Sequence, residues 1–386
     1  MLKEEIIFGE LSWVLENDSV RIAITQRGAQ AAPMAFRDSA GCEIQPYCVT
    51  PWQEEACKPP AGMPESMLRG DFFCLPFGEA EQELMMSAHG RTSSELWSRK
   101  AFNCRPGVQA LCIHMQEAIQ NAAATRYFFL RDGETVVYDL AVIDGLDGEF
   151  TIGHHAILRV PEQDEALLIS TSEVAAGRTF PALFVDRDNG EQQGLAIDAE
   201  FSDLRRVPAF RGDGSTVDCS RYPTRRGCSD LLQLALEAKP GMLAWTAAVN
   251  TEEGYLRYSL RDAGLLPSTI LWIENCARRS SPWNGRTRLL GIEDVCTYFN
   301  LGSEQAREPN SLSRRGIKTV QRFSTSERYL LPYIQGAIRV PKGFGRVQRM
   351  EKEAQGVSFI DENGVRIATR VQTDFAVGNL SAFMDA

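Results

Sequence analysis

Apolar and polar positions alternate with a period of two over much of the chain. Val20, Ile22 and Ile24 are separated by Arg21 and Ala23, which is the pattern of a half-buried strand. Two hairpins are predicted where strand-like runs flank a turn dipeptide: 127–130 and 135–143 around Asp132-Gly133, and 357–360 and 365–369 around Asn363-Gly364.

The rest of the chain gives more short strands and few helices. Further strands are expected at 167–171, 194–197, 241–249 and 268–273. Residues 251–258 are a helical candidate, and 230–237 fit a helix and a strand equally well. Segments 40–66 and 205–226 have the composition of long surface loops. Short strands separated by turns predict an all-β protein, an antiparallel sandwich or barrel.

Composition narrows the class of protein. The chain has 386 residues, of which 44% are hydrophobic, enough for a large core. No break in composition divides it, so we expect one domain over 1–386 rather than two. The net charge of −10 argues against nucleic acid as a partner. The C-terminal half is nevertheless rich in arginine, which leaves room for a local anion site.

The chain's start and its cysteines indicate the compartment. The first residues, MLKEEII, lack the basic end and apolar core of a signal peptide, and no apolar run is long enough for a membrane helix. We therefore expect a cytoplasmic protein without a membrane partner. Its ten cysteines contain no C-x-x-C pair, so we expect reduced, mostly buried thiols rather than a zinc site or a disulfide framework.

Four histidines are the first candidates for chemistry. His114 lies in an apolar strand and is interpreted as a core residue, whereas His89 lies in a polar loop. His154 and His155 are neighbours in a predicted strand, so they point to opposite faces and cannot chelate one metal ion together. The face that carries His155 is the more polar one, where a substrate would lie.

A carboxylate and several aromatic residues complete the candidates. Glu293 stands among apolar neighbours, where desolvation would raise its pKa toward the range of a useful base. The tryptophans, among them Trp97, Trp272 and Trp283, offer flat faces that suit sugar rings.

The order of these motifs resembles that of the galactose mutarotase-like (aldose 1-epimerase) superfamily. In that order the chain shows Arg69-Gly70, Leu75-Pro-Phe-Gly78, His89-Gly90, the strand around His155, and Leu290-Gly-Ile-Glu293. The resemblance covers roughly residues 10–300 as short motifs. It implies a large antiparallel β-sandwich, the galactose mutarotase-like supersandwich, and a carbohydrate epimerase that interconverts sugar anomers.

The resemblance also implies roles for single residues. By position, Glu293 matches the family's catalytic base, His155 its catalytic acid and His89 a second histidine near the sugar ring. Arg69 matches a hydroxyl-binding arginine. His154 stands where the family commonly has asparagine, and on that match alone, against the strand alternation, it is expected to be a substrate-binding residue. Trp97, Trp283 and Arg286 are further expected substrate contacts. Asp294 stands where proline is common, and Arg91 where an apolar residue is common.

The chemistry explains these residue types. Anomer exchange needs a base at the anomeric hydroxyl and an acid at the ring oxygen, and each group reverses its role on ring closure. No metal and no organic cofactor is required. Two alternatives stay open: a non-catalytic sugar-binding or regulatory protein on the same fold, and a glycoside-cleaving enzyme that pairs Glu293 with Glu79 or Asp71.

The arginines that precede Glu293 suggest the charge of the substrate. Arg278, Arg279, Arg286 and Arg288 crowd this stretch of an otherwise acidic protein. Guanidinium groups suit phosphate or carboxylate oxygens, so the carbohydrate could be anionic.

Overall fold

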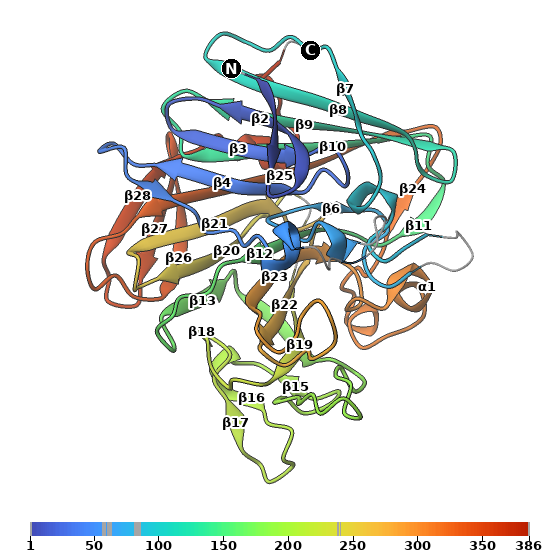
Figure 1. Ribbon diagram of the computed structural model, residues 1–386, viewed down its shortest axis with the longest axis vertical. Coiled ribbons are helices and arrows are strands. Elements are labelled where there is room, and N and C mark those ends of the chain that lie inside the picture. Colours follow the sequence, from blue (N-terminus) through green and yellow to red (C-terminus); the bar gives the residue numbers. More distant parts are fainter. Residues whose placement is uncertain are drawn as a thin grey trace.

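Antiparallel strands dominate the computed structural model, which describes residues 2–55, 59, 64–80, 86–237, 239 and 241–384 (Figure 1). Two large sheets form its centre. The nine-stranded sheet contains, in order across it, β18 (Arg221–Tyr222), β13 (Leu167–Thr171), β20 (Leu243–Asn250), β21 (Tyr255–Asp262), β25 (Arg328–Arg339), β10 (Val136–Asp144), β9 (Ala122–Arg131), β8 (Val108–Ile119) and β7 (Ser98–Lys100).

The second large sheet carries the residues that matter most for function. Its seven strands are, in order, β15 (Glu200–Phe201), β14 (Val174–Thr179), β19 (Ser229–Leu236), β22 (Ser268–Asn275), β23 (Arg288–Cys296), β12 (Ile152–Leu158) and β6 (Phe73–Cys74). Both sheets have edge strands, so the architecture is a sandwich and not a barrel.

Smaller elements surround the sandwich. A five-stranded sheet near the N-terminus contains β1 (Lys3–Ile7), β2 (Glu10–Glu16), β3 (Val20–Thr25), β4 (Ala31–Arg37) and β5 (Glu43–Ile44). A three-stranded sheet near the C-terminus contains β26 (Val347–Glu353), β27 (Gly356–Asp361) and β28 (Arg366–Arg370). Two short pairs are β11 (Gly148–Phe150) with β24 (Gln321–Phe323), and β16 (Val207–Pro208) with β17 (Thr216–Val217).

Helices are short and lie in connections. The described α-helix is α1 (Gly302–Arg307), and the single-turn 3₁₀ segments are η1 (Pro51–Glu54), η2 (Pro64–Ser66), η4 (Arg91–Ser93), η5 (Leu204–Arg206), η6 (Ser313–Arg315) and η7 (Thr373–Val377). No helix among the described residues is long and apolar enough to cross a membrane.

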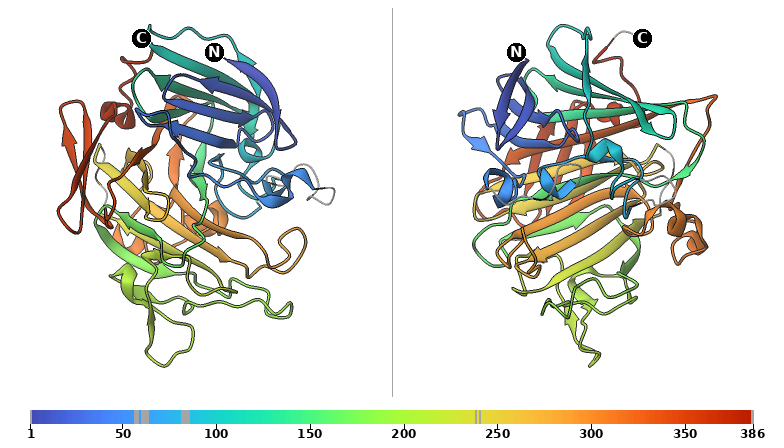
Figure 2. Two further views of the ribbon diagram at one scale, coloured as in Figure 1. Left: turned by 60° about the vertical axis from the view of Figure 1, so that its left-hand side comes forward. Right: turned by 45° about the vertical axis from the view of Figure 1, so that its right-hand side comes forward.

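Three apolar layers hold the sheets. The main core lies between the two large sheets, where Ala156 and Ile292 of one sheet join the same cluster as Ala141 and Tyr333 of the other. The outer face of the nine-stranded sheet is covered by β26–β28 and η7, with Phe375 in that cluster (Figure 2). A third cluster lies on the outer face of the seven-stranded sheet.

Most of the predicted elements are confirmed. The strand at 20–24, both hairpins and the strands at 167–171, 241–249 and 268–273 are present, and 230–237 lies in strand β19. Segments 40–66 and 205–226 are irregular where they are described, with only short elements; Cys57 and its neighbours lie outside the described residues. The nine described cysteines are all free thiols, and five of them are buried.

Two predicted elements are wrong. Residues 251–254 form a turn and 255–262 form strand β21, so 251–258 is not a helix. Residues 194–197 are not a strand: Leu195 forms only an isolated antiparallel bridge with Ala209, and the backbone N–H groups of Gly194 and Leu195 both donate to the Asp230 carboxylate.

Candidate active site

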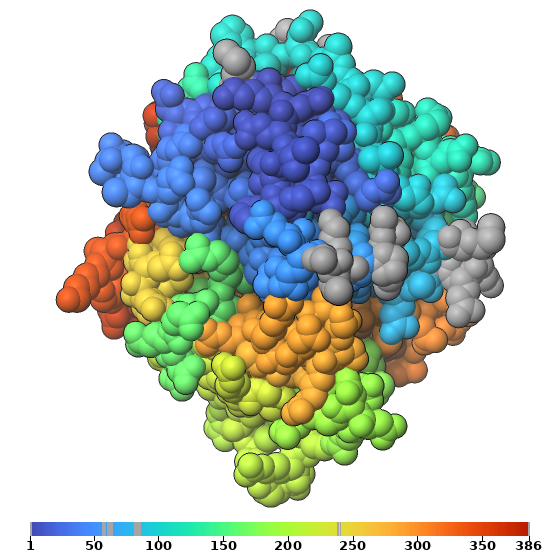
Figure 3. Space-filling view, viewed as in Figure 1, coloured from blue at the N-terminus to red at the C-terminus, as the bar shows by residue number. Residues whose placement is uncertain are grey.

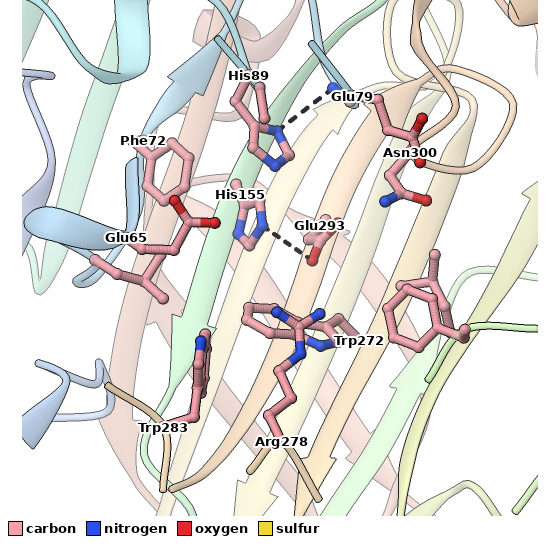
Figure 4. A pocket seen from close by; sticks show the side chains of 15 residues that line it. Glu65, Phe72, Glu79, His89, His155, Trp272, Arg278, Trp283, Glu293 and Asn300 are labelled. Atoms are coloured by element: carbon pink, nitrogen blue, oxygen red, sulfur yellow. Dashed lines mark hydrogen bonds and ion pairs between the residues drawn. The ribbon is translucent and has the colours of Figure 1, made fainter. Parts of the chain in front are cut away.

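A cleft opens on the outer face of the seven-stranded sheet, above β12, β22 and β23 (Figure 4). The space in it that is open to the centres of water-sized groups is about 150 Å³. Its floor carries His155, Glu293 and Trp272, and its walls come from connections that carry His89, Arg278 and Trp283. Three of the residues predicted to be functional, His89, His155 and Glu293, therefore meet in one cleft.

His155 and Glu293 face each other across two neighbouring strands. They are register partners in the antiparallel pair of β12 and β23, which brings side chains on one face close together. His155 Nε2 lies 3.4 Å from Glu293 Oε1, and both side chains are buried. The sheet itself thus holds a carboxyl group and an imidazole in contact at the bottom of the cleft (Figure 4).

Burial shifts the pKa values of the two groups in opposite directions. It raises the pKa of Glu293 well above the usual range of a carboxyl group. It lowers the pKa of His155 well below its usual value, and the nearby His89 and Arg278 lower it further. Burial therefore favours the neutral form of both groups, a protonated carboxyl group beside a neutral imidazole.

His89 completes a cluster of rings around His155. Its ring centre lies 4.9 Å from that of His155, and Phe72 stacks on His155 at 4.6 Å. His89 Nδ1 accepts a hydrogen bond from the Gly78 N–H at 3.4 Å, which makes Nε2 the protonated nitrogen of the neutral ring. Burial lowers the pKa of His89 to about 4, so it is a neutral donor at pH 7.

Arg278 is held by aromatic rings at the opposite side of the cleft. Its guanidinium carbon lies 5.1 Å from the ring centre of Trp272, 5.0 Å from that of Trp283 and 5.8 Å from that of Phe184. The buried Glu274 lies 3.7 Å from Arg278 Nε and also accepts the backbone N–H of Arg278. Figure 4 shows the guanidinium pointing toward His155 and Glu293.

The structure places His154 away from the cleft, as strand alternation requires. Its Nδ1 is hydrogen-bonded to Asp71 Oδ2 at 2.9 Å, and its ring stacks on Tyr333 at 3.9 Å, between the two large sheets. The prediction that His154 contacts substrate, which came from the motif position alone, conflicts with this placement.

Arg69 does not reach the cleft either. Its guanidinium is fully buried and donates to the carbonyl groups of Met67, Ile7 and Phe8 and to the side chain of Gln53. The arginine of the Arg-Gly motif thus joins the N-terminal hairpin to the 48–70 segment. Four of its five N–H donors are used in these bonds, and it does not line the cleft.

The other two expected contacts also lie elsewhere. Trp97 is buried in the main core, and its Nε1 donates to the Thr92 carbonyl group. Arg286 lies outside the cleft lining and forms a bidentate pair with Glu55, at 2.8 and 2.7 Å. Figure 3 shows the blue segment that precedes residue 56 and the orange segment around residue 286 meeting on the surface. Trp283 is the one of the expected binding residues that lines the cleft.

Several cleft residues carry no sequence signal. Phe72, Glu65 and Asn300 line the cleft, and the Asn300 Oδ1 atom is buried without a partner in the described chain. Asn300 lies after the end of β23 and belongs to none of the sequence motifs. Only the fold brings it near Glu79 and His89.

One cluster of the described residues has the spacing of a metal site. Oxygen and nitrogen atoms of Asp71, Asp139 and His154 lie within 4.8 Å of one another. The guanidinium of Arg126 already pairs with Asp139, and His154 pairs with Asp71. Because the buried guanidinium of Arg126 already supplies a positive charge at Asp139, the cluster is better explained as an ion-pair network between the sheets than as a metal site.

The fold is that of the galactose mutarotase-like proteins. A candidate aldose 1-epimerase from Klebsiella pneumoniae superposes with a TM-score of 0.57 at 13% identity, over 88% of this chain and 83% of its own. A candidate mutarotase from Salmonella typhimurium gives 0.56 at 11%, over 88% and 94%. The galactose mutarotase related enzyme from Lactobacillus acidophilus gives 0.53 at 10%, over 86% and 99%.

Comparison of the sequence alone gives no such result. No family model matches it, and no curated protein does. The structural likeness therefore shows the fold, and the chemistry of the cleft has to be argued from its own residues.

Proposed function

We propose that the protein is a carbohydrate epimerase that interconverts the anomers of a sugar by acid–base ring opening. The contact between Glu293 and His155 at the floor of the cleft carries this proposal. A carboxyl group and an imidazole at 3.4 Å can act on two neighbouring oxygen atoms of one sugar ring.

The pair needs one shared proton to work. The cycle begins when the shared proton passes from Glu293 to His155, a step that forms an ion pair against the desolvation of both groups. Glu293 as carboxylate then removes the proton of the anomeric hydroxyl group while the imidazolium protonates the ring oxygen. The bond between C1 and the ring oxygen then breaks, and O1 becomes a carbonyl oxygen. The pair is now neutral, which is the state that burial favours for both groups.

Ring closure reverses both roles. After rotation about the C1–C2 bond, the former ring oxygen attacks the other face of the carbonyl carbon and gives its proton to His155. Glu293 returns its proton to O1. The sum of protons on the pair is unchanged over the cycle, so no cofactor is consumed.

The surrounding residues suit a sugar. Trp272 and Trp283 offer flat apolar faces, and the neutral His89 offers an N–H donor. Trp272 Nε1 is a buried donor without a partner in the described chain, and Asn300 Oδ1 is a matching acceptor. A ligand that forms hydrogen bonds with such atoms gains binding free energy, because an unpaired buried polar atom is unfavourable.

A ligand screen tests the proposal first. Monosaccharides, sugar phosphates and uronic acids are added singly, and melting temperature is measured, because a ligand of the folded state raises it. We expect at least one aldose to raise it. A protein that binds aldoses but does not exchange their anomers would be a binding protein instead.

Glycoside cleavage remains the second candidate for one reason. Glu79 lines the same cleft as the protonated Glu293, whereas Asp71 lies between the sheets and is removed from consideration. Release of free sugar from an oligosaccharide panel would support cleavage, and anomer exchange without release would support the epimerase.

We propose further that the substrate of this epimerase is an anionic sugar, whose negative group is bound by Arg278. Among described residues its ion-pair partner is Glu274, reached through Nε, so the terminal nitrogens can meet a ligand. Glu65 and Glu79 lie on the other side of the cleft, where they suit hydroxyl groups (Figure 4). Of the four arginines before Glu293, only Arg278 lines the cleft; Arg286 and Arg288 pair with surface carboxylates and Arg279 is exposed.

A matched pair of variants tests the anion. Arg278→Gln should weaken binding of a sugar phosphate or uronic acid at least tenfold and of the neutral sugar less than threefold. Arg288→Gln, which removes an arginine paired with Glu162 outside the cleft, should change neither affinity. Affinity for the anionic sugar should also fall with salt. If Arg278→Gln weakened binding of the anionic and the neutral sugar by the same factor, or weakened neither, the anionic substrate would be contradicted.

A further inference from the structure

Strand β23, which carries Glu293, is apolar on both faces. Leu289 and Val295 point into the cluster beside the cleft, and Leu290 and Ile292 point into the main core. All of its residues except Arg288 are buried. In most half-buried strands the contrast between an apolar and a polar face sets the register, but here the apolar pattern gives no such contrast.

Asp294 gives one face of β23 a specific polar contact and so distinguishes the two faces. Its fully buried carboxylate lies between the sheets. Four groups surround it: the Ser259 hydroxyl at 2.6 Å, the Thr269 hydroxyl at 2.8 Å, the Tyr333 hydroxyl at 2.8 Å and Arg261 Nη1 at 2.8 Å. These groups belong to β21, β22 and β25, so one side chain of β23 is tied to three other strands.

The contacts of Asp294 lie on the opposite face of the sheet from the candidate catalytic pair, Glu293 and His155. Asp294 is the register partner of His154, as Glu293 is of His155, so the two pairs lie back to back on β12 and β23. Tyr333 donates to Asp294 and stacks on His154. His154 in turn is hydrogen-bonded to Asp71.

We propose that Asp294 is a positioning residue, which fixes the register of β23 and so places Glu293 in the cleft. Side chains alternate along a strand, so a slip by one residue would turn Glu293 into the core and Asp294 into the cleft. Such a slip would separate the buried Arg261 from its carboxylate and leave a buried charge unpaired, which is strongly unfavourable. The role at Glu293 rests on the proposed function; the register itself does not.

The test compares two buried carboxylates of one sheet. Asp294→Asn keeps the shape and removes the charge that pairs with Arg261. Asp230→Asn is the matched control, because Asp230 is a buried carboxylate of β19 that pairs with Arg225 at 3.3 Å and does not line the cleft. Both variants lose a buried ion pair, so both should melt at a lower temperature than the wild type.

Two measurements separate positioning from general stability. Hydrogen exchange followed by mass spectrometry should be at least tenfold faster in the 288–296 peptide of Asp294→Asn, and unchanged there in Asp230→Asn. Anomer exchange should fall at least 100-fold in Asp294→Asn and less than threefold in Asp230→Asn. The hydrogen exchange result stands even if the wild type turns over no sugar, so failure of the proposed function is distinguishable.

A milder variant keeps the test open if Asp294→Asn does not fold. Tyr333→Phe removes only one of the three hydroxyl donors and keeps the ion pair with Arg261, so it should give a smaller change in the same two measurements. Wild-type hydrogen exchange in the 288–296 peptide of both variants would overturn the proposal. So would an equal loss of turnover in Asp294→Asn and Asp230→Asn.

Discussion

At the scale of single residues, burial is the largest cause of the pKa shifts in the cleft, ahead of neighbouring charges. The same desolvation favours the neutral forms of Glu293, His89 and His155. Transfer of a proton from Glu293 to His155 therefore forms a buried ion pair at an electrostatic cost. Ring opening removes that ion pair, because it leaves both groups neutral.

The first prediction concerns the acid–base pair. Glu293→Gln and His155→Asn should each remove most turnover and leave sugar affinity within about tenfold, or roughly 1.4 kcal/mol, because both keep size and polarity and lose the transferable proton. The double variant should be little slower than either single one, since the two groups act as a unit. Kinetics and calorimetry on the same preparations check this.

His154→Asn is the control for that prediction. Its ring lies between the sheets, so the substitution should lower the melting temperature more than the turnover. An essential His154 beside a dispensable His155 would contradict the assignment of the pair.

The second prediction is a dependence of stability on pH. His89 has a pKa of about 4 in the folded protein and about 6.5 when unfolded, so the unfolded chain binds the extra proton between these values. Its contribution to stability is therefore complete above pH 6.5 and is lost as pH falls toward 4, by up to about 3 kcal/mol.

Urea unfolding at pH 7 and pH 4.5 measures this contribution. His89→Gln should lose less stability on acidification than the wild type, because glutamine does not titrate. The neutral His155 adds a loss of the same sign to both proteins, so only the difference between them reports on His89. Parallel losses in the two proteins would show that His89 is not held neutral by the fold.

At the scale of elements, one face of each strand acts in the cleft and the other holds the sandwich together. Strand alternation was enough to predict that His155, and not His154, faces the cleft. The position of Arg69 could not be predicted in this way. Its motif neighbour Gly70 has a φ of +55° and a Cβ there would lie 1.8 Å from the Ala31 carbonyl oxygen, so the motif serves a tight chain crossing.

The third prediction uses the glycine in front of Glu293. A Cβ at Gly291 would lie 2.5 Å from Glu293 Oε1 and 3.0 Å from Trp272 Cβ. Gly291 and Glu293 share a face, and the nearest atom is the end of a movable side chain. Gly291→Ala should therefore displace the carboxyl group, and lower turnover at least tenfold while unfolding free energy changes by about 1 kcal/mol or less.

Turnover and urea unfolding of Gly291→Ala check this together. A variant that unfolds easily would mean that the strand, and not the Glu293 side chain, absorbs the added methyl group. A variant with unchanged turnover would mean that the position of the carboxyl group is unimportant.

At the scale of the whole molecule, the sequence predicted the class of fold but not every wall of the cleft. The period of two and the turn dipeptides determine strands locally, so an antiparallel sandwich or barrel followed from them, and the family resemblance singled out the sandwich. Arg278, Phe72 and Asn300 come to the cleft from three distant connections, and their meeting depends on tertiary packing. Trp97 and Arg286 were chosen by residue type near a motif, and residue type does not give direction.

Residues 347–384 form a separate layer of the molecule. Strands β26–β28 and segment η7 cover the outer face of the nine-stranded sheet, on the side away from the main core (Figure 2). Phe375 and Phe383 are completely buried in that layer. This layer lies outside the motifs of the resemblance and contributes to stability, whereas the cleft lies on the other large sheet.

Anomer exchange measured by NMR saturation transfer tests the central claim most directly. The sugar that raises the melting temperature most is studied at equilibrium, with and without the protein, near neutral pH. The account predicts that exchange between the two anomeric proton signals accelerates in proportion to wild-type protein, and returns to the buffer rate with Glu293→Gln. An exchange rate equal to that in buffer, for every sugar that the wild type binds, would contradict it.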